Sequence, residues 1–230
     1  MMYRLHALTL LSAGLFLAGG ALTRAADINV PAGGAHLAEA IAAAQSGDRL
    51  FLASGTHAGQ VVINKALTLE GEDGATVDAG GTGTVIAIFA SNVSVRGLTL
   101  RNSGPKGEAF DSGVYIEKGA DNVTIEGNRM ENNLFGVVLH GSKNATVRAN
   151  IIANRTDLRL NDRGNGIHIW NNSGSLIEGN TVTSGRDGIY IEISHGNFIR
   201  TNWFQGLRFA VHYMYANNNE VSGNTSIRNH

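Results

Sequence analysis

GIHIWNNSGSLIEGN (166–180) and GIYIEISHGNFIRTN (188–202) are two copies of one repeat, and the fold class follows from this repeat. Further copies are GVYIEKGADNVTIEGN (113–128), GVVLHGSKNATVRAN (136–150) and AVHYMYANNNEVSGN (210–224), and every copy ends on an asparagine. The intervals between these asparagines are 22, 30, 22 and 22 residues. Each copy contains two short alternating strands split by a polar turn, which is typical of a solenoid with a repeat of about 20 residues. One copy cannot bury its apolar face alone, so we expect a stacked coil.

The asparagine that ends each copy is predicted to stack on its equivalent in the next rung. Plain turn propensity explains any single asparagine, whereas five in register favour a ladder of side-chain amides inside the coil. The five are Asn128, Asn150, Asn180, Asn202 and Asn224. The composition agrees with a chain of many corners, because 30 of its 230 residues are Gly and only 2 are Pro. Glycine and asparagine tolerate the positive backbone angles that sharp corners demand.

Met1–Ala25 has the pattern of a signal peptide. Arg4 supplies the positive start, residues 8–22 are apolar, and Thr23-Arg24-Ala25-Ala26 offers a small-residue cleavage region. The apolar run is shorter than the ~20 residues that a membrane-spanning helix needs. We therefore expect cleavage after Ala25, export of the protein, and a single β-helix domain over residues 26–230.

The charge balance argues against nucleic acid as a partner. The chain has 18 Lys and Arg against 19 Asp and Glu, a formal net charge of −1, and loss of Arg4 and Arg24 with the signal peptide changes this to −3. Nucleic-acid binding needs a basic surface. The chain has no cysteine, which excludes thiolate catalysis, thiolate metal sites and disulfides. Any soft-metal site would have to use histidine and methionine.

The segment before the repeats predicts a cap and the first rungs of the coil. HLAEAIAAAQ (36–45) is an amphipathic helix pattern ended by Gly47-Asp48, and a solenoid needs such a cover over its first rung. Strands are expected at 50–52, 60–63, 66–70, 85–89 and 93–100. Two insertions, RNSGPKGEAFDS (101–112) and IANRTDLRLNDRGN (152–165), should project as loops from one edge of the coil.

Two segments resemble known families. The helix, with SGDRLFLASGTHAG (46–59) and LTLEGEDGATVDAG (67–80), is similar to the opening of right-handed parallel β-helix proteins of the carbohydrate-binding and sugar-hydrolase type. RDGIYIEISHGNFIRTNWFQGLRFAVHYMYANNNEVSGN (186–224), above all RFAVHYMY (208–215), resembles the NosD family of the nitrous oxide reductase maturation system. Members of that family usually continue for many more rungs, so we expect this chain to be truncated at its C-terminus.

These resemblances imply a fold and a function. The fold is all-β, a right-handed parallel β-helix (solenoid) with a short N-terminal capping helix. The resemblance to NosD implies a periplasmic accessory protein, not an enzyme, that serves the assembly of the copper centre of nitrous oxide reductase. Its implied partners are the subunits of a membrane ABC transporter and nitrous oxide reductase or a copper chaperone, and its implied cofactor is transiently bound copper.

The alternation of the strands assigns side chains to the two faces of the coil. The inward set is Ile167, Ile169, Ile189, Ile191, Val211 and Tyr213. The outward set is His168, Trp170, Tyr190, Glu192, His212 and Met214, with His195 in the turn beside it. Because neighbouring rungs lie about 4.8 Å apart, the outward set should form one compact patch.

Three interpretations of this patch stay open. It is a solvated or partner-covered face, since strands accept such residues readily; or a metal-handling surface, since imidazole and thioether suit copper; or a carbohydrate site. The predicted copper ligands are His212 and Met214, helped by Glu192, His168 or His195. Glycoside hydrolysis needs two carboxyl groups about 5 to 10 Å apart, and Glu192 has only Trp170 and Met214 as neighbours in its column.

The last repeat predicts an unpaired edge. Residues 221–227 end a rung for which this sequence supplies no neighbour. Uncovered strand edges invite pairing with another chain. We therefore expect the isolated protein to self-associate or to depend on a partner, and light scattering at high concentration would test this.

Overall fold

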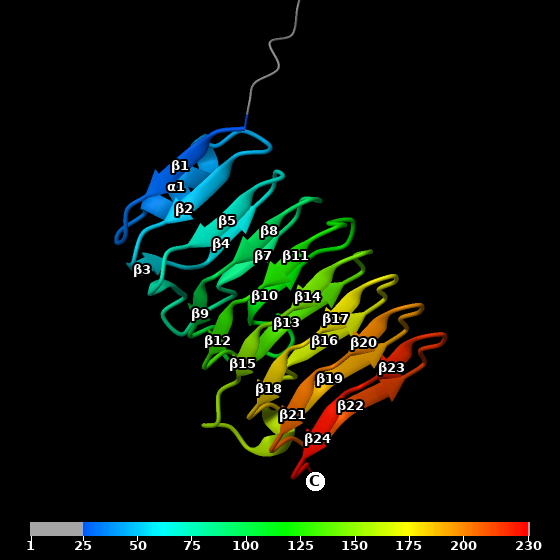
Figure 1. The fold of residues 1–230 in the computed structure, drawn as a ribbon. Helices are drawn as coiled ribbons and strands as arrows, with labels where there is room; N and C mark the ends of the chain where they lie inside the picture. Colours follow the sequence, from blue (N-terminus) through cyan, green and yellow to red (C-terminus); the bar gives the residue numbers. More distant parts are fainter. Residues whose placement is uncertain (1–24, 230) are drawn as a thin grey trace, which may run out of the picture.

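The computed structural model describes residues 25–229, which form one coil of stacked parallel strands (Figure 1). The signal peptide predicted over residues 1–25 lies outside the described residues, apart from Ala25. Each full rung contributes one strand to each of three parallel sheets, so equivalent strands lie above one another along the coil. This confirms the predicted β-helix. No helix within residues 25–229 has the length and apolarity needed to cross a membrane.

The three sheets run the length of the coil. Sheet A has the order β1 (Asp27–Val30), β2 (Arg49–Leu52), β5 (Thr68–Gly71), β8 (Ser94–Arg96), β11 (Thr124–Glu126), β14 (Thr146–Arg148), β17 (Leu176–Glu178), β20 (Phe198–Arg200) and β23 (Glu220–Ser222). Sheet B contains β3 (Gly55–Ala58), β6 (Ala75–Asp78), β9 (Thr99–Arg101), β12 (Arg129–Glu131), β15 (Ile151–Ala153), β18 (Thr181–Thr183), β21 (Trp203–Gln205) and β24 (Thr225–Ile227). Sheet C contains β4 (Val61–Ile63), β7 (Ile86–Ile88), β10 (Ser112–Ile116), β13 (Phe135–His140), β16 (Ile167–Trp170), β19 (Asp187–Glu192) and β22 (Phe209–Met214).

Sheet B was only partly predicted from the sequence. The repeated phrases contain the strands of sheets C and A, whereas the strands of sheet B follow the terminal asparagine and most are only three residues long. The single strand expected over 93–100 was wrong for the same reason, because β8 and β9 are separated by a corner. Gly97 has a φ of +66° there, and the backbone N–H of Leu98 donates to Asn128 Oδ1 at 3.1 Å.

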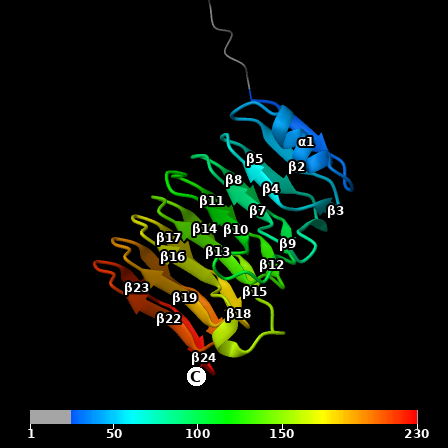
Figure 2. The same cartoon turned by 180° about the vertical axis from the view of Figure 1, so that it is seen from behind.

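The N-terminal cap is the helix α1 (His36–Ala43), which lies at the N-terminal end of the stack (Figures 1 and 2). Leu37 and Ile41 are buried, and the helix packs against β1 to β4, which confirms its predicted role. It ends two residues earlier than the sequence predicts. The backbone becomes extended at Ala44, and the N–H of Gln45 donates to the carboxylate of Asp48 at 2.7 Å, which turns the chain away from the helix.

The predicted asparagine ladder runs through the buried corner between sheets A and B. The side-chain amide nitrogen of Asn128 donates to Asn150 Oδ1 at 3.2 Å, and that of Asn150 donates to Asn180 Oδ1 at 2.9 Å. Asn180 continues the chain to Asn202 at 2.9 Å, and Asn202 to Asn224 at 3.0 Å. The register of the repeats is thereby fixed by side chains as well as by backbone.

The glycine that opens a repeat leaves room for the next rung. At Gly188 a Cβ atom would overlap the ring of Phe204 and the carbonyl oxygen of Ala210, and at Gly166 it would overlap Val182. Gly188→Ala is therefore expected to lower the free energy of unfolding by about 2 kcal/mol through overpacking. Gly107→Ala is the matched control, because nothing lies within 4 Å of a Cβ atom there. Equal urea midpoints for the two variants would contradict this account.

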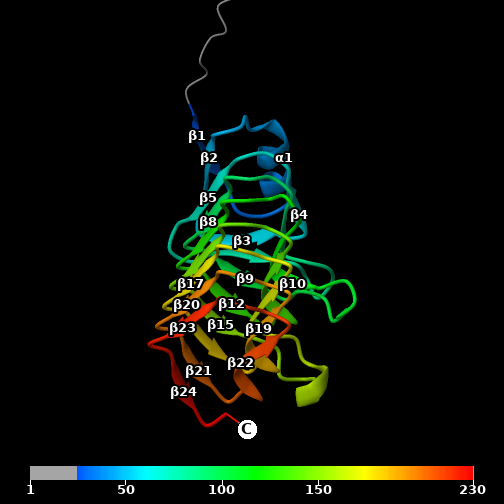
Figure 3. The same ribbon diagram turned by 90° about the vertical axis from the view of Figure 1, so that its right-hand side faces the viewer.

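Both insertions project on the same side of the coil, as predicted (Figure 3). The second contains a short 3-10 helix, η1 (Leu160–Asp162). Phe110 of the first insertion and Leu158 of the second pack against a small cluster outside the main core, formed by Leu134, Phe135 and Val138. The insertions therefore cover part of the outer face of sheet C. In the last rung, β22, β23 and β24 have no further neighbour within the described residues, and self-association through this edge stays a prediction.

Candidate functional site

The outer face of sheet C, with the residues that cover it, carries the close aromatic contacts of the molecule. The ten ring pairs found within residues 25–229 all lie here. Their members are Phe110, Tyr115, Phe135, His140, His168, Trp170, Tyr190, Phe209 and His212. We call this surface the aromatic face. Parallel strand pairing puts Tyr190 beside His168 and His212, and Glu192 beside Trp170 and Met214.

Sheet A presents a different outer surface. One column alternates in charge from rung to rung, in the order Glu70, Arg96, Glu126, Arg148, Glu178 and Arg200. Arg96 lies 2.7 Å from Glu70, and Arg148 lies 2.8 Å from Glu126. These charges pair with one another and help to fix the register of the strands. The charged column of sheet A therefore has a structural role that needs no ligand. The aromatic face is thus the better candidate for a functional site.

His168 was predicted to be exposed, and this prediction was wrong. Its side chain is only 8% exposed, because Phe110 and Phe135 lie against its ring with centroids 5.1 and 5.6 Å away. Asn165 Nδ2 donates to His168 Nδ1 at 3.0 Å. Burial, helped by the nearby positive charge of Arg186 and by His140, lowers the pKa of His168 to about 4. The imidazole is therefore neutral near pH 7, with its proton on Nε2.

His212 is held by a buried carboxylate. Asp187 is fully buried at the start of β19, and its Oδ2 accepts from His212 Nδ1 at 3.0 Å and from Arg208 at 2.6 Å. Burial opposes ionisation of Asp187, but these hydrogen bonds outweigh it and keep its pKa below the ordinary value. Arg208 Nη2 also lies 3.2 Å from His212 Nδ1, but the shorter contact to the carboxylate assigns the ring proton to Nδ1. The lone pair of Nε2 is then left for another partner.

The other predicted ligands are only partly brought together. Met214 is paired in register with Glu192, whose carboxylate accepts from the Tyr190 hydroxyl at 3.3 Å. His195 lies in the turn, where its Nδ1 accepts from the backbone N–H of Asn217 at 3.0 Å. Tyr190 lies between His168 and His212: its ring stacks on His168 with centroids 5.0 Å apart, and it meets His212 edge to face with centroids 4.9 Å apart. Within residues 25–229 no three His, Asp or Glu side chains converge closely enough to hold a metal ion.

The predicted inward set is buried as far as β19. Ile167, Ile169, Ile189 and Ile191 are wholly buried. Tyr213 is 41% exposed, and its hydroxyl accepts from Asn219. Val211 and Tyr213 pair in register with Ile189 and Ile191, so they lie on the predicted inward side. Tyr213 is nevertheless exposed, because the described chain supplies no further rung to cover it.

A cavity of about 320 Å³ opens on the aromatic face. It is lined by Phe110, His140, His168, Trp170 and Glu192. His140 and Trp170 stack almost in parallel, with centroids 4.5 Å apart and an interplanar angle of 11°. The cavity thus has aromatic walls and a single carboxylate.

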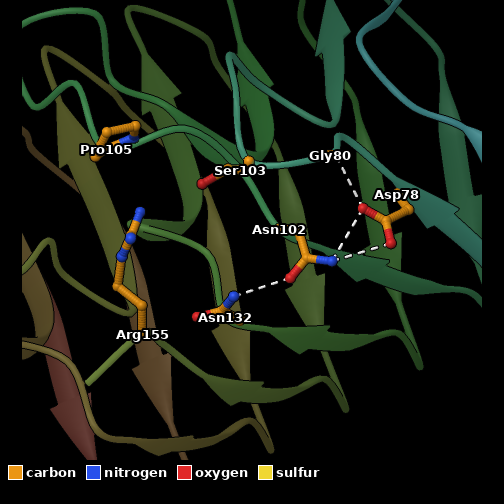
Figure 4. A pocket seen from close by; sticks show the side chains of 8 residues that line it. Asp78, Gly80, Asn102, Ser103, Pro105, Asn132 and Arg155 are labelled. Atoms are coloured by element: carbon orange, nitrogen blue, oxygen red, sulfur yellow. Dashed lines mark hydrogen bonds between the residues drawn. The ribbon is translucent and has the colours of Figure 1, made fainter. Parts of the chain in front are cut away.

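A second hollow, of about 450 Å³, lies beside sheet B between the two insertions (Figure 4). Asn132 donates to Asn102 at 2.8 Å, and Asn102 donates to the carboxylate of Asp78 at 2.9 and 3.0 Å. Arg155, at the opposite side of the hollow, is paired with Asp157 at 2.6 Å. These polar side chains form hydrogen bonds or ion pairs with one another or with neighbouring residues. They stabilise the turns between rungs, and no ligand is needed to account for them.

Comparison with known proteins identifies the family to which this fold belongs. Residues 83–230, more than half of the chain, match the family model described as a right-handed β-helix region. The chain belongs to the right-handed β-helix family. This confirms the handedness that the resemblance to β-helix proteins implied.

The chain is also similar to proteins named probable ABC transporter binding protein NosD. It is 37% identical over 140 residues to that of Pseudomonas aeruginosa and 38% identical over 141 residues to that of Stutzerimonas stutzeri. Each match covers 61% of this chain but only 33% and 32% of the relatives. The match thus spans about a third of the length of these relatives. The alginate lyase AlyGC of family PL6 is a solved structure with a TM-score of 0.48 and 18% identity, covering 87% of this chain and 39% of that one.

Three residues of this site were missed from the sequence as participants. Phe110 is a single aromatic residue inside a polar insertion, a pattern that indicates packing against the body of the protein. The surface against which it packs could not be predicted from the sequence. Asp187 stands at the start of a strand, and alternation alone does not tell whether it faces His212. Arg208 lies within the motif that resembles NosD, yet its pairing with Asp187 joins two neighbouring rungs.

Proposed function

We propose that this protein is a periplasmic accessory protein of the NosD type that works with a membrane ABC transporter and passes copper toward nitrous oxide reductase. The printed names of the relatives support the association with a transporter. The observation that carries the copper role is the Asp187–His212 hydrogen bond. A histidine that ligates a metal commonly donates its other ring N–H to a carboxylate, which fixes the tautomer and raises the basicity of the ligand.

The proposed copper ligands are His212 Nε2 and Met214, with Glu192 as a third ligand or a nearby charge. Imidazole and thioether suit copper, and Met214 is two residues from His212 on the same strand, with Cβ atoms roughly 6.5 to 7 Å apart. His168 is proposed only to line the approach, because it is buried and Nδ1 already accepts a hydrogen bond. His195 would have to release Asn217 first. Such an incomplete ligand set suits a protein that must release its cargo.

Copper binding is expected to stabilise the mature protein. At 100 times its dissociation constant, copper should raise the free energy of unfolding by about 2.7 kcal/mol. His212→Ala combined with Met214→Ala should abolish this gain. The copper-free protein should lose about 2 kcal/mol, because buried Asp187 loses the hydrogen bond from His212 but keeps that from Arg208. Thermal and urea unfolding with and without copper measure both quantities.

Two further variants test the role of Asp187 and control for the loss of a histidine. Asp187→Asn should weaken copper binding by about tenfold to a hundredfold, because the carboxylate that orients His212 is lost. His36→Ala, which removes an exposed histidine at the opposite end of the coil, is the matched control. An unchanged copper response in the His212 and Met214 double variant would reject these ligands.

A carbohydrate-binding or polysaccharide-processing role is the alternative. The cavity beside Trp170 could stack a sugar ring, and a glycan panel in the same unfolding assay would detect this. A hydrolase would need two available carboxyl groups. Asp187 is buried and paired with Arg208 and His212, so it is not free to assist Glu192. We therefore propose a protein that is not an enzyme.

A further inference from the structure

The cavity of about 320 Å³ on the aromatic face shares Glu192 and His168 with the copper proposal, but the rest of its lining is Phe110, His140 and Trp170, and it contains neither His212 nor Met214. Trp170 and His140 form one stacked wall, and Phe110 stands over His168. Tryptophan presents the aromatic face that attracts cations most strongly. A site of this kind suits a ligand that combines an apolar body with a positive charge.

The carboxylate of Glu192 lacks a basic partner. Within residues 25–229 no Lys, Arg or His lies within salt-bridge distance of it, and its only side-chain hydrogen bond comes from the Tyr190 hydroxyl. Its neighbours in register are Trp170 and Met214. The acidic groups of sheet A, by contrast, are flanked by arginines in register. Glu192 is thus an acid beside an aromatic wall, free to meet a cation from outside.

The surrounding charges keep the cavity attractive to cations. His168 in its lining is neutral near pH 7. His140 pairs with Glu117 at 2.9 Å, which adds a second carboxylate behind the stacked wall. Arg186 and Arg208 lie nearby but both face Asp187, at 3.6 and 2.6 Å. Glu192, Glu117 and Asp187 thus place three carboxylates around the cavity, against the two guanidinium groups of Arg186 and Arg208.

The first insertion is shaped to close this cavity. Asp111 accepts from the backbone N–H of Lys106 at 3.0 Å, and the N–H of Phe110 donates to the carbonyl of Gly107 at 3.1 Å. This turn holds Phe110 at a φ of +52°, a conformation that is uncommon for a bulky residue. Backbone outliers of this kind cluster at ligand clamps.

We propose that this cavity is a binding site for an organic cation, an alkylammonium or guanidinium group held between Trp170, Phe110 and the Glu192 carboxylate. Such a group could belong to a small molecule or to a Lys or Arg side chain of a partner protein. The chemistry that recognises it is the same in both cases.

Calorimetric titration with choline and with its neutral isostere 3,3-dimethylbutan-1-ol tests the proposal. The two probes have similar shape, so we expect choline to bind at least about tenfold more tightly through cation–π attraction and the carboxylate. Trp170→Leu and Glu192→Gln should each reduce choline affinity by about fivefold or more, whereas Trp170→Phe, which keeps a ring, should lose less. Trp203→Leu is the matched control, because Trp203 lies in sheet B. Thermal unfolding of each variant checks that it is folded.

A second readout locates the ligand. The chain has 2 tryptophans, so Trp203→Phe leaves Trp170 as the only one, and choline should change its fluorescence. Titration with the N-acetyl methylamides of lysine and arginine separates the two sources, since tighter binding of these amides than of choline favours a partner side chain. Equal affinity for the neutral isostere, or unchanged choline binding by both Trp170→Leu and Glu192→Gln, would overturn the proposal. The His212 and Met214 double variant should bind choline normally, so failure of the copper proposal would leave this one standing.

Discussion

Replacing Asn180 by alanine is expected to lower the free energy of unfolding by about 4 kcal/mol, because four side-chain hydrogen bonds inside the coil are lost at once. Asn180 is 1% exposed. Its Oδ1 accepts from the backbone N–H and the side-chain amide of Asn150, at 3.0 and 2.9 Å. Its Nδ2 donates to the carbonyl of Val147 at 2.8 Å and to Asn202 Oδ1 at 2.9 Å. The backbone N–H of Asn150 would be left buried without its partner.

Asn224→Ala is the matched control for this prediction. Asn224 occupies the same position in the repeat and makes the same kinds of bond, but it is only partly buried. Water can replace its lost partners, so we expect a loss of about 1 kcal/mol. Urea unfolding followed by circular dichroism measures both variants.

Asn180→Asp separates hydrogen bonding from shape. Aspartate keeps the size of the side chain, but an ionised carboxylate cannot donate to Val147 or Asn202. We expect a loss at least as large as that for alanine at neutral pH. A stability loss for Asn180→Ala no larger than for Asn224→Ala would mean that the ladder does not hold the rungs together.

The ladder is also the clearest case in which the sequence predicts a buried contact. A fixed period, an asparagine at one position and alternating strands on either side leave few alternatives. The inward positions of sheet C follow from the same periodicity, and Ile167, Ile169, Ile189 and Ile191 are buried as expected. In a solenoid each repeat contacts only the repeats next to it, at equivalent positions. The sequence of one repeat therefore predicts which residues of its neighbours it will contact.

The candidate site was less predictable, because it depends on segments that break the period. Alternation correctly gives the outward columns of sheet C, including the adjacency of Tyr190 and His212. It cannot tell that Phe110 and Leu158, from two insertions, fold back onto this face. For that reason His168 was assigned to the surface. Asp187 and Arg208 were missed as the partners of His212, since side-chain pairing between rungs depends on rotamers that periodicity does not determine.

The burial of His168 makes the stability of the folded protein depend on pH. Its pKa is about 4 in the folded protein, against an ordinary value of 6.5, and burial is the main cause. Between these two values the unfolded chain takes up a proton that the folded protein does not bind. Stability should therefore be complete above about pH 6.5 and fall as the pH drops toward 4, with no further contribution from this group below that. The difference in pKa corresponds to about 3 kcal/mol.

His168→Gln isolates this contribution. Glutamine is neutral at every pH, and its side-chain oxygen can accept from Asn165 as His168 Nδ1 does. Between pH 7 and pH 4 the unmodified protein should lose about 3 kcal/mol more stability than this variant. His36→Gln, which removes an exposed histidine from the capping helix, controls for the loss of one imidazole. Urea unfolding at a series of pH values measures all three proteins, and parallel pH profiles for the unmodified protein and His168→Gln would refute the prediction.

Phe110→Ala tests whether the insertion is what keeps His168 neutral. Removing this ring admits water to the imidazole, so the desolvation that lowers its pKa is reduced. NMR titration of the His168 ring should then show a pKa shifted upward toward 6.5, and the extra loss of stability between pH 7 and 4 should shrink by the corresponding amount. The same substitution opens the cavity beside Trp170 and allows a positive charge on His168 near neutral pH. In Phe110→Ala, choline affinity should therefore fall with pH over a range in which the unmodified protein keeps His168 uncharged and its affinity constant. Such a difference would show that the covering loop controls the charge inside the cavity.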